Sequence, residues 1–199
     1  MSYQAILFDL DGTLIETPEL WAEAYSLALA EFGRELPMEK FWELYPLGIH
    51  VEEWLEDLGI DRSHTAQLRE SRDRHYEELL RTQVDWIAGA EEVFHSICKN
   101  YPTGIITGSH KSYIDAIEEK IDIRRHTGAF IDSNELPKGR GKPCPDGLLL
   151  ACKRLDVDPT ECIYIGDMAV DMEAAKAAQM VSCFIECPHM PSVTDKADF

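Results

Sequence analysis

The sequence has no long apolar run. No stretch of its 199 residues approaches the ~20 consecutive apolar residues that a membrane-spanning helix needs. The N-terminus also lacks a basic region followed by an apolar signal core, because a strand-like apolar run begins almost at once, at Ala5. We therefore expect a cytoplasmic protein without a membrane partner.

Positive charge is scarce as well. The chain has 37 Asp and Glu residues against 19 Lys and Arg residues, which gives a formal net charge of -18. An acidic surface repels nucleic acids and anionic lipid, so we expect no nucleic-acid partner. An anionic substrate would need strong local attraction at its binding site.

Two sequence motifs typical of other protein classes, CxxC and GxGxxG, are missing as well. The six cysteines show no CxxC pair, so we interpret them as reduced thiols. Cys183, Cys187 and His189 could suggest a soft-metal site, but no second ligand pair is present to complete a zinc shell. No GxGxxG follows the first apolar run, which excludes a dinucleotide-dependent oxidoreductase.

The most informative stretch that is present is Asp9-Leu-Asp11-Gly-Thr13, directly after an apolar run. Residues two apart on an extended chain point the same way, so both carboxylates can face one site. Their mutual repulsion falls when a hard divalent cation binds beside them. The alternative is that both aspartates form side-chain to backbone hydrogen bonds in a turn.

Periodicity predicts two kinds of architecture. Between Thr17, a predicted helix cap before Pro18, and Val84, the apolar spacing is helical, with helices expected up to Gly33 and over residues 38–44, 51–58 and 66–80. From Gly89 onward, helical patterns alternate with apolar strands. The expected strands are residues 103–107, 128–132, 162–166 and 181–185, and the expected helices are 90–97, 109–121, 145–155 and 168–179.

This order predicts an α/β fold, with a Rossmann-like parallel sheet covered by helices on both faces. The sheet domain would comprise residues 1–14 and 86–199, and residues 15–85 would form an inserted all-helical domain. Residues 188–199 carry little structural signal.

Polar groups follow several of the predicted strands. Strand ends in such sheets gather at one edge, where ligands bind. Each residue also has a local interpretation, as a helix cap, a loop charge or support for a helix N-terminus. The residues concerned are Asp9, Asp11, Thr107, Lys142, Asp167 and Asp171.

Taken together, these motifs resemble those of haloacid-dehalogenase-superfamily hydrolases with a helical cap. The matching motifs are Asp9-x-Asp11-Gly-Thr, Ile-Ile-Thr107-Gly108, Lys142-Pro and Gly-Asp167-x-x-x-Asp171. The stretch around Lys142 also resembles the phosphoglycolate-phosphatase-like branch. The chain departs from the pattern at Met168, where the family usually has a small hydroxyl residue.

The resemblance implies a Mg²⁺-dependent phosphatase that acts on a small phosphorylated metabolite. Asp9 would be the nucleophile that forms an aspartyl-phosphate, and Asp11 would protonate the leaving group and then activate water. Asp9, the backbone carbonyl of Asp11 and Asp167 would hold Mg²⁺, with Asp171 beside them.

The remaining roles concern the substrate. Lys142, the Thr107 hydroxyl and the Gly108 amide would bind phosphoryl oxygens. Tyr45 and His50, in the loop between two cap helices, are candidates for substrate recognition, although the loop could equally be an ordinary connector.

Two alternatives stay open: a phosphomutase of the β-phosphoglucomutase kind, and a non-catalytic binding module. The cap loop of residues 45–50 has no Lys or Arg to hold a second phosphate, which disfavours the mutase. The expected assembly is a monomer or a homodimer.

Overall fold

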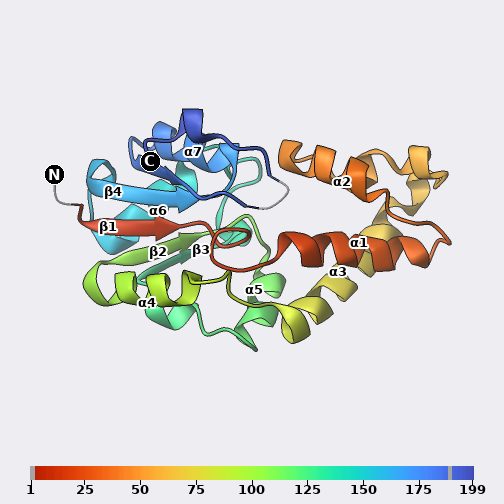
Figure 1. The fold of residues 1–199 in the computed structure, drawn as a ribbon, viewed down its shortest axis with the longest axis horizontal. Coiled ribbons are helices and arrows are strands. Elements are labelled where there is room, and N and C mark those ends of the chain that lie inside the picture. Colours follow the sequence, from red (N-terminus) through yellow and green to blue (C-terminus); the bar gives the residue numbers. More distant parts are fainter. Residues whose placement is uncertain (1–2, 188–189) are drawn as a thin grey trace.

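The protein is described by a computed structural model that covers residues 3–187 and 190–199. A parallel five-stranded sheet with the order β3-β2-β1-β4-β5 forms one end of the molecule (Figure 1). Its strands are β1 (Ala5–Phe8), β2 (Thr103–Ile106), β3 (Ala129–Ile131), β4 (Cys162–Gly166) and β5 (Val181–Phe184). β1 is the central strand, and its Leu7 lies opposite Gly104 on one side and Tyr164 on the other. The predicted α/β class with a parallel sheet is confirmed.

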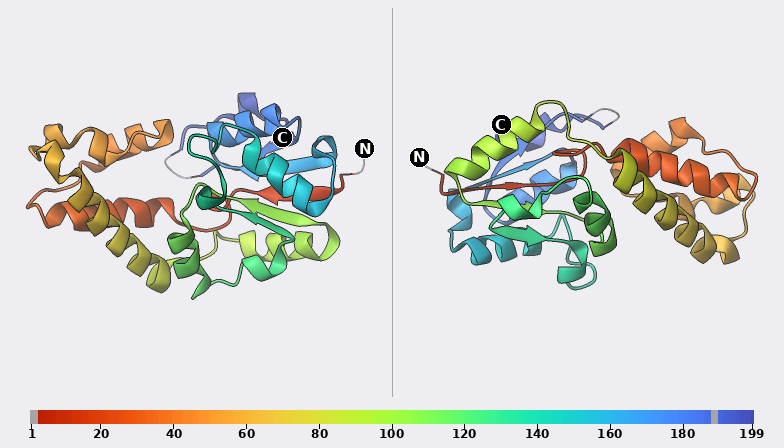
Figure 2. Two further views of the ribbon diagram at one scale, coloured as in Figure 1. Left: turned by 180° about the vertical axis from the view of Figure 1, so that it is seen from behind. Right: turned by 90° about the horizontal axis from the view of Figure 1, so that it is seen from below.

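Helices cover both faces of this sheet (Figure 2). α4 (Ala90–Asn100) and α5 (Lys111–Glu118) cover one face, and α6 (Asp146–Leu155) and α7 (Ala169–Ala177) cover the other. Successive residues of β1 point to opposite faces, so Phe8 packs on Phe94 of α4 while Leu7 joins the core under α6 and α7. Burial on both faces explains why the strands are apolar without alternation.

The chain between β1 and α4 is helical, as predicted. It contains α1 (Pro18–Ala30), α2 (Met38–Leu44) and α3 (Thr65–Gln83), which lie beyond the carboxyl ends of the strands (Figure 1). Short 3-10 helices connect them: η1 (Tyr45–Leu47), η2 (Val51–Glu53), η3 (Leu55–Leu58) and η4 (Arg62–His64). This part has an apolar core of its own, which includes Tyr25, Leu29, Phe41 and Leu68.

The prediction of one helix over residues 51–58 is wrong. The segment forms η2 and η3, which are separated at Trp54, where φ is -130° and ψ is 30°. The apolar positions are buried as their spacing suggests, with Val51 and Leu55 each 1% exposed. Two tight turns separated at the non-helical Trp54 place the indole in the core, and the Lys40 ammonium group lies 4.5 Å from the ring centroid. Tertiary packing therefore overrides the helical periodicity here.

The C-terminal segment is ordered more extensively than its sequence suggests. It forms η8 (Thr194–Lys196), and then the Asp198 amide donates to the Ser182 carbonyl of β5 at 3.2 Å. The other short 3-10 helices are η5 (Arg124–His126), η6 (Ser133–Glu135) and η7 (Pro159–Glu161). Within the described residues, no helix is long and apolar enough to cross a membrane.

Candidate active site at the carboxyl ends of the strands

A buried ion-pair cluster lies where β1 and β4 end. The Lys142 ammonium group contacts Asp9 Oδ1 and Asp171 Oδ1, each at 2.6 Å. Asp9 is 4% exposed and Asp171 is fully buried. The structure thus brings together three of the predicted residues, although Lys142 is 133 positions from Asp9 in the chain.

Asp167 completes an acidic group that could hold a metal. One carboxylate oxygen each from Asp9, Asp167 and Asp171 lies within 4.8 Å of the others. The Thr13 hydroxyl donates to Asp167 Oδ1 at 2.9 Å and fixes this side chain. Gly12 is required here: its φ is +79°, and a Cβ at this position would approach Asp167 Oδ2 to 2.5 Å. The glycine of the first motif therefore makes room for the aspartate of the last one.

The electrostatics of the cluster favour a bound cation. Burial raises the pKa of Asp9 well above its usual value, and the charges of Asp171, Asp167 and Asp11 add to this effect, whereas Lys142 opposes it. Burial and then the charge of Asp171 raise the pKa of Asp167 to about 7. Burial disfavours the charged form of Lys142, but Asp171 and Asp9 outweigh it, so its pKa is raised and it stays a cation.

Lys142 contacts the carboxyl groups of Asp9 and Asp171, and Asp167 adds a third, so the cluster has more acidic groups than its one cation can neutralise. The ligand atoms on offer are carboxylate oxygens, which suit Mg²⁺ better than a soft metal. The donor set therefore fits the predicted cofactor.

Asp11 has different surroundings from the other aspartates. Its carboxylate accepts hydrogen bonds from the hydroxyls of Thr107 at 2.7 Å, Ser109 at 2.9 Å and Thr17 at 2.9 Å. Thr17 precedes α1 but makes no side-chain cap bond to the helix, so the expected helix-cap role is wrong: its hydroxyl serves Asp11 instead. Because the Asp11 carboxylate does not join the metal-ligand group, only its backbone carbonyl remains a predicted ligand.

Asp171 has two further donors that sequence reasoning missed. The Tyr164 hydroxyl donates to Asp171 Oδ1 at 3.0 Å, and the Met168 amide donates to Asp171 Oδ2 at 3.0 Å. The backbone of Met168 thus contributes although its side chain has no hydroxyl. A tyrosine within an otherwise apolar buried strand was the available signal for the first donor.

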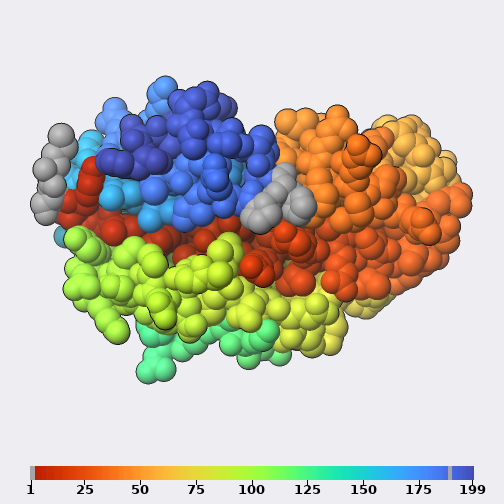
Figure 3. Space-filling model, in the orientation of Figure 1, coloured from red at the N-terminus to blue at the C-terminus, as the bar shows by residue number. Residues whose placement is uncertain are grey.

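The two predicted cap residues are placed differently. Burial raises the pKa of the Tyr45 hydroxyl, and the negative charges of Asp11, Asp167 and Asp9 raise it further. The Tyr45 ring stacks on Phe41 at 5.4 Å. His50 is exposed, and its ring faces the Trp21 ring at 6.5 Å. No hydrogen bond or ion pair between described residues joins the His50 side chain to the cluster. In Figure 3 the surface over α2 lies beside the segment that follows β5.

A cavity of about 160 Å³ adjoins the cluster. Thr107, Gly108 and Lys142, the three predicted phosphoryl-binding residues, line one side of it. Ser133 and Lys138 line another part. The structure therefore groups these three residues around one cavity, to which Asp9 is connected through its ion pair with Lys142.

The soft-metal hypothesis at Cys183, Cys187 and His189 is not tested, because His189 lies outside the described residues. Burial and then the negative charge of Asp167 raise the pKa of the Cys187 thiol to about 12.

A family model described as haloacid dehalogenase-like hydrolase matches residues 6–185. The chain belongs to this family. Among curated relatives, the phosphoglycolate phosphatase of Xanthomonas campestris pv. campestris is 29% identical, with 90% of this chain and 81% of the relative covered. The (DL)-glycerol-3-phosphatase 2 of Arabidopsis thaliana is 27% identical, with 97% and 84% covered.

Solved structures show the same fold. CbbY of Rhodobacter sphaeroides, in complex with xylulose-(1,5)bisphosphate, has a TM-score of 0.81 at 20% identity, and the likeness covers 98% of this chain and 92% of that one. The predicted family is therefore confirmed, and the two curated relatives named above are phosphatases.

Proposed function

We propose that this hydrolase is a Mg²⁺-dependent phosphatase of small phosphorylated metabolites, which works through a phosphorylated Asp9. The observation that carries the proposal is the meeting of Asp9, Lys142, Asp167 and Asp171 within one buried cluster. The family motifs that contain Asp9, Lys142 and the pair Asp167 and Asp171 thus meet in one place. Residues 15–85 would act as the cap, with the rest of the chain as the catalytic domain.

Asp9 would supply the attacking oxygen. Lys142 orients its carboxylate and offsets the repulsion between that carboxylate and a phosphoryl dianion. Asp9, Asp167 and Asp171 would be placed to hold Mg²⁺, together with the carbonyl of Asp11; the metal, when bound, supplies charge neutralisation of the phosphoryl group. Thr107 and Gly108 would bind a further phosphoryl oxygen from the side of the cavity.

Asp11 would carry the proton. Three hydroxyl groups hold its carboxylate, which lies apart from the carboxylates that would bind the metal. A group that transfers a proton to the leaving oxygen needs such a position, because a metal ligand would not be free to do so. It would protonate the departing alkoxide and then take a proton from the water that attacks the aspartyl-phosphate. Water attack on phosphorus would regenerate Asp9 and release inorganic phosphate.

The test is phosphate release from a generic aryl phosphate with and without Mg²⁺, for the wild type and for Asp9→Asn. We expect the substitution to remove at least ~10³-fold of kcat, because the amide cannot attack phosphorus although it keeps the shape of the side chain. Product analysis with a sugar phosphate distinguishes hydrolysis from isomerisation. Turnover retained in Asp9→Asn contradicts the nucleophile assignment.

A further inference from the structure

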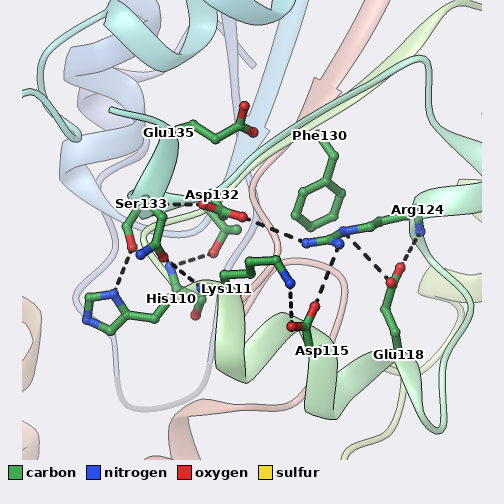
Figure 4. A network of polar contacts seen from close by, with 12 residues as sticks. His110, Lys111, Asp115, Glu118, Arg124, Phe130, Asp132, Ser133 and Glu135 are labelled. Atoms are coloured by element: carbon green, nitrogen blue, oxygen red, sulfur yellow. Dashed lines mark hydrogen bonds and ion pairs between the residues drawn. The ribbon is translucent and has the colours of Figure 1, made fainter. Parts of the chain in front are cut away.

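Charged side chains are paired in two regions beside the candidate site. In the helical region, residues 15–85, the guanidinium of Arg72 donates to Glu52 at 2.9 Å. Beside β3, the Lys111 ammonium group pairs with Asp115 at 2.5 Å, and Arg124 lies within 3.7–3.8 Å of three carboxylates (Figure 4). These charges balance one another, so neither network needs a ligand to balance it. The reactive side chains that the proposed mechanism does not use are thiols, and two of them are in contact.

Cys152 of α6 and Cys162 of β4 form a buried pair of thiols. Their Sγ atoms are 3.7 Å apart, and the two residues are 1% and 0% exposed. Both belong to the apolar core between the sheet and the helices α6 and α7. Cys162 is the first residue of β4 and lies opposite Ala5, the first residue of β1. The pair therefore lies at the end of the sheet away from the acidic cluster.

The separation of the two sulfur atoms is close to that of a covalent bond. A disulfide has an S–S distance of about 2 Å, so the atoms would have to approach by about 1.7 Å. Small rotations of two cysteine side chains cover such a distance without a change of backbone fold. The bond would close the loop of residues 152–162 and join α6 to β4.

The two thiols are not equivalent. The Cys162 thiol donates to the backbone carbonyl of Asp158 at 3.2 Å, which leaves the Cys152 thiol to donate to the Cys162 sulfur. This hydrogen bond lowers the pKa of Cys162, and the same bond together with burial raises the pKa of Cys152. Cys162 is therefore the thiol that ionises more readily, and Cys152 is placed to attack its sulfur once that sulfur is oxidised.

A short connection covers the pair on the outside. Residues 156–161 join α6 to β4, and Asp158 and Glu161 in it are exposed. Asp156 has a left-handed backbone conformation, with a φ of 55°, which favours glycine. In this connection Val157 packs against the core, and it is only partly buried. A segment with so few buried apolar contacts opens locally more readily than the strands do, which admits a small neutral molecule.

We infer that Cys152 and Cys162 are a modification site: they form a reversible disulfide with hydrogen peroxide as the oxidant, and this bond clasps α6 to β4. The inference is independent of the proposed function. The Cys162 thiolate attacks one peroxide oxygen, the O–O bond breaks, and hydroxide leaves and takes up the thiol proton as water. The Cys152 sulfur then attacks the Cys162 sulfenic acid, the S–O bond breaks, and a second water leaves. Two thiols and one peroxide thus give one disulfide and two waters, and dithiothreitol reverses the reaction.

Peptide mapping tests the bond directly. The folded full-length protein is treated with hydrogen peroxide, its remaining thiols are blocked, and it is digested with trypsin without reductant. We expect a linked pair of peptides, residues 141–153 and 155–176, that dithiothreitol separates. Because the first peptide also contains Cys144, the matched variants are Cys152→Ala, which should abolish the link, and Cys144→Ala, which should keep it.

Thermal unfolding tests the clasp. The peroxide-treated wild type should have a midpoint at least ~3 °C above that of the same sample after dithiothreitol, because the bond restricts the unfolded chain. Cys152→Ala should show no such difference. Absence of the linked peptides in the wild type, or their persistence in Cys152→Ala, overturns the site, and a linked protein that melts no higher than the reduced one overturns the clasp. If Cys152→Ala does not fold, fragmentation of the linked wild-type peptides identifies the joined cysteine.

Discussion

The strand-end cluster and the helical region use charge in opposite ways. At the strand ends one ammonium group lies among several buried carboxyl groups, so the cluster has an excess of acidic groups that a divalent cation can balance. In the helical region the buried guanidinium of Arg72 is already balanced by Glu52 and Asp73. In the proposed function the sheet edge would supply the reactive charge, and the helical region would enclose the substrate.

The largest effect should follow from removing the cation of the strand-end cluster. Lys142→Met leaves Asp9 and Asp171 buried without their partner, which typically costs about 3–5 kcal/mol in the free energy of unfolding. We expect this loss in urea denaturation of the metal-free protein near pH 7, together with loss of phosphatase activity. Lys138→Met, at an exposed lysine beside the same cavity, is the control and should change stability by under ~0.5 kcal/mol. Similar stability losses in both variants would show that the cluster does not depend on its ion pairs.

Substitution of Asp167 should change the free energy of unfolding by a smaller amount and in the opposite direction. Its pKa is raised from 3.8 to about 7 by burial and by Asp171, so the folded protein holds a proton that the unfolded chain releases. The contribution of this group to stability is therefore present below about pH 4 and is lost as pH rises to about 7. Above pH 7, Asp167→Asn should stabilise the metal-free protein by roughly 2–4 kcal/mol, because the amide removes a buried charge.

The measurement is the thermal midpoint of metal-free protein at pH 5 and pH 8, followed by addition of Mg²⁺. Mg²⁺ should raise the midpoint of the wild type and have little effect on Asp167→Asn, since binding the folded state stabilises it. Asp195→Asn removes an exposed carboxylate and serves as the control. A wild type that is insensitive to Mg²⁺ would contradict the metal site.

The same contrast explains how much could be predicted from the sequence. Parallel strands bring their carboxyl ends to one edge, so the meeting of Asp9, Asp167 and Lys142 follows from motif order and topology. The hydrogen-bond partners of Asp11 cannot be predicted in this way. The local preference of Thr17 is to cap a helix, and its hydroxyl binds the Asp11 carboxylate, 6 residues earlier, only because of tertiary packing. The separation of η2 from η3 at Trp54 has the same cause, since it depends on which core the indole enters.

The smallest change in stability is expected at one of the polar contacts between the helical region and the sheet domain. The Tyr113 hydroxyl of α5 donates to Asp73 Oδ1 of α3 at 2.7 Å. Asp73 keeps its bonds from Arg72 when this donor is removed, so Tyr113→Phe should cost only about 1 kcal/mol in urea denaturation. If the contact also holds α3 over the strand ends, KM for glycerol 3-phosphate should rise while kcat on an aryl phosphate changes less than twofold. A Tyr113→Phe protein with wild-type KM would show that the helical region is held in place by apolar packing, including the Trp21, Tyr76 and Tyr113 rings, without help from this hydrogen bond.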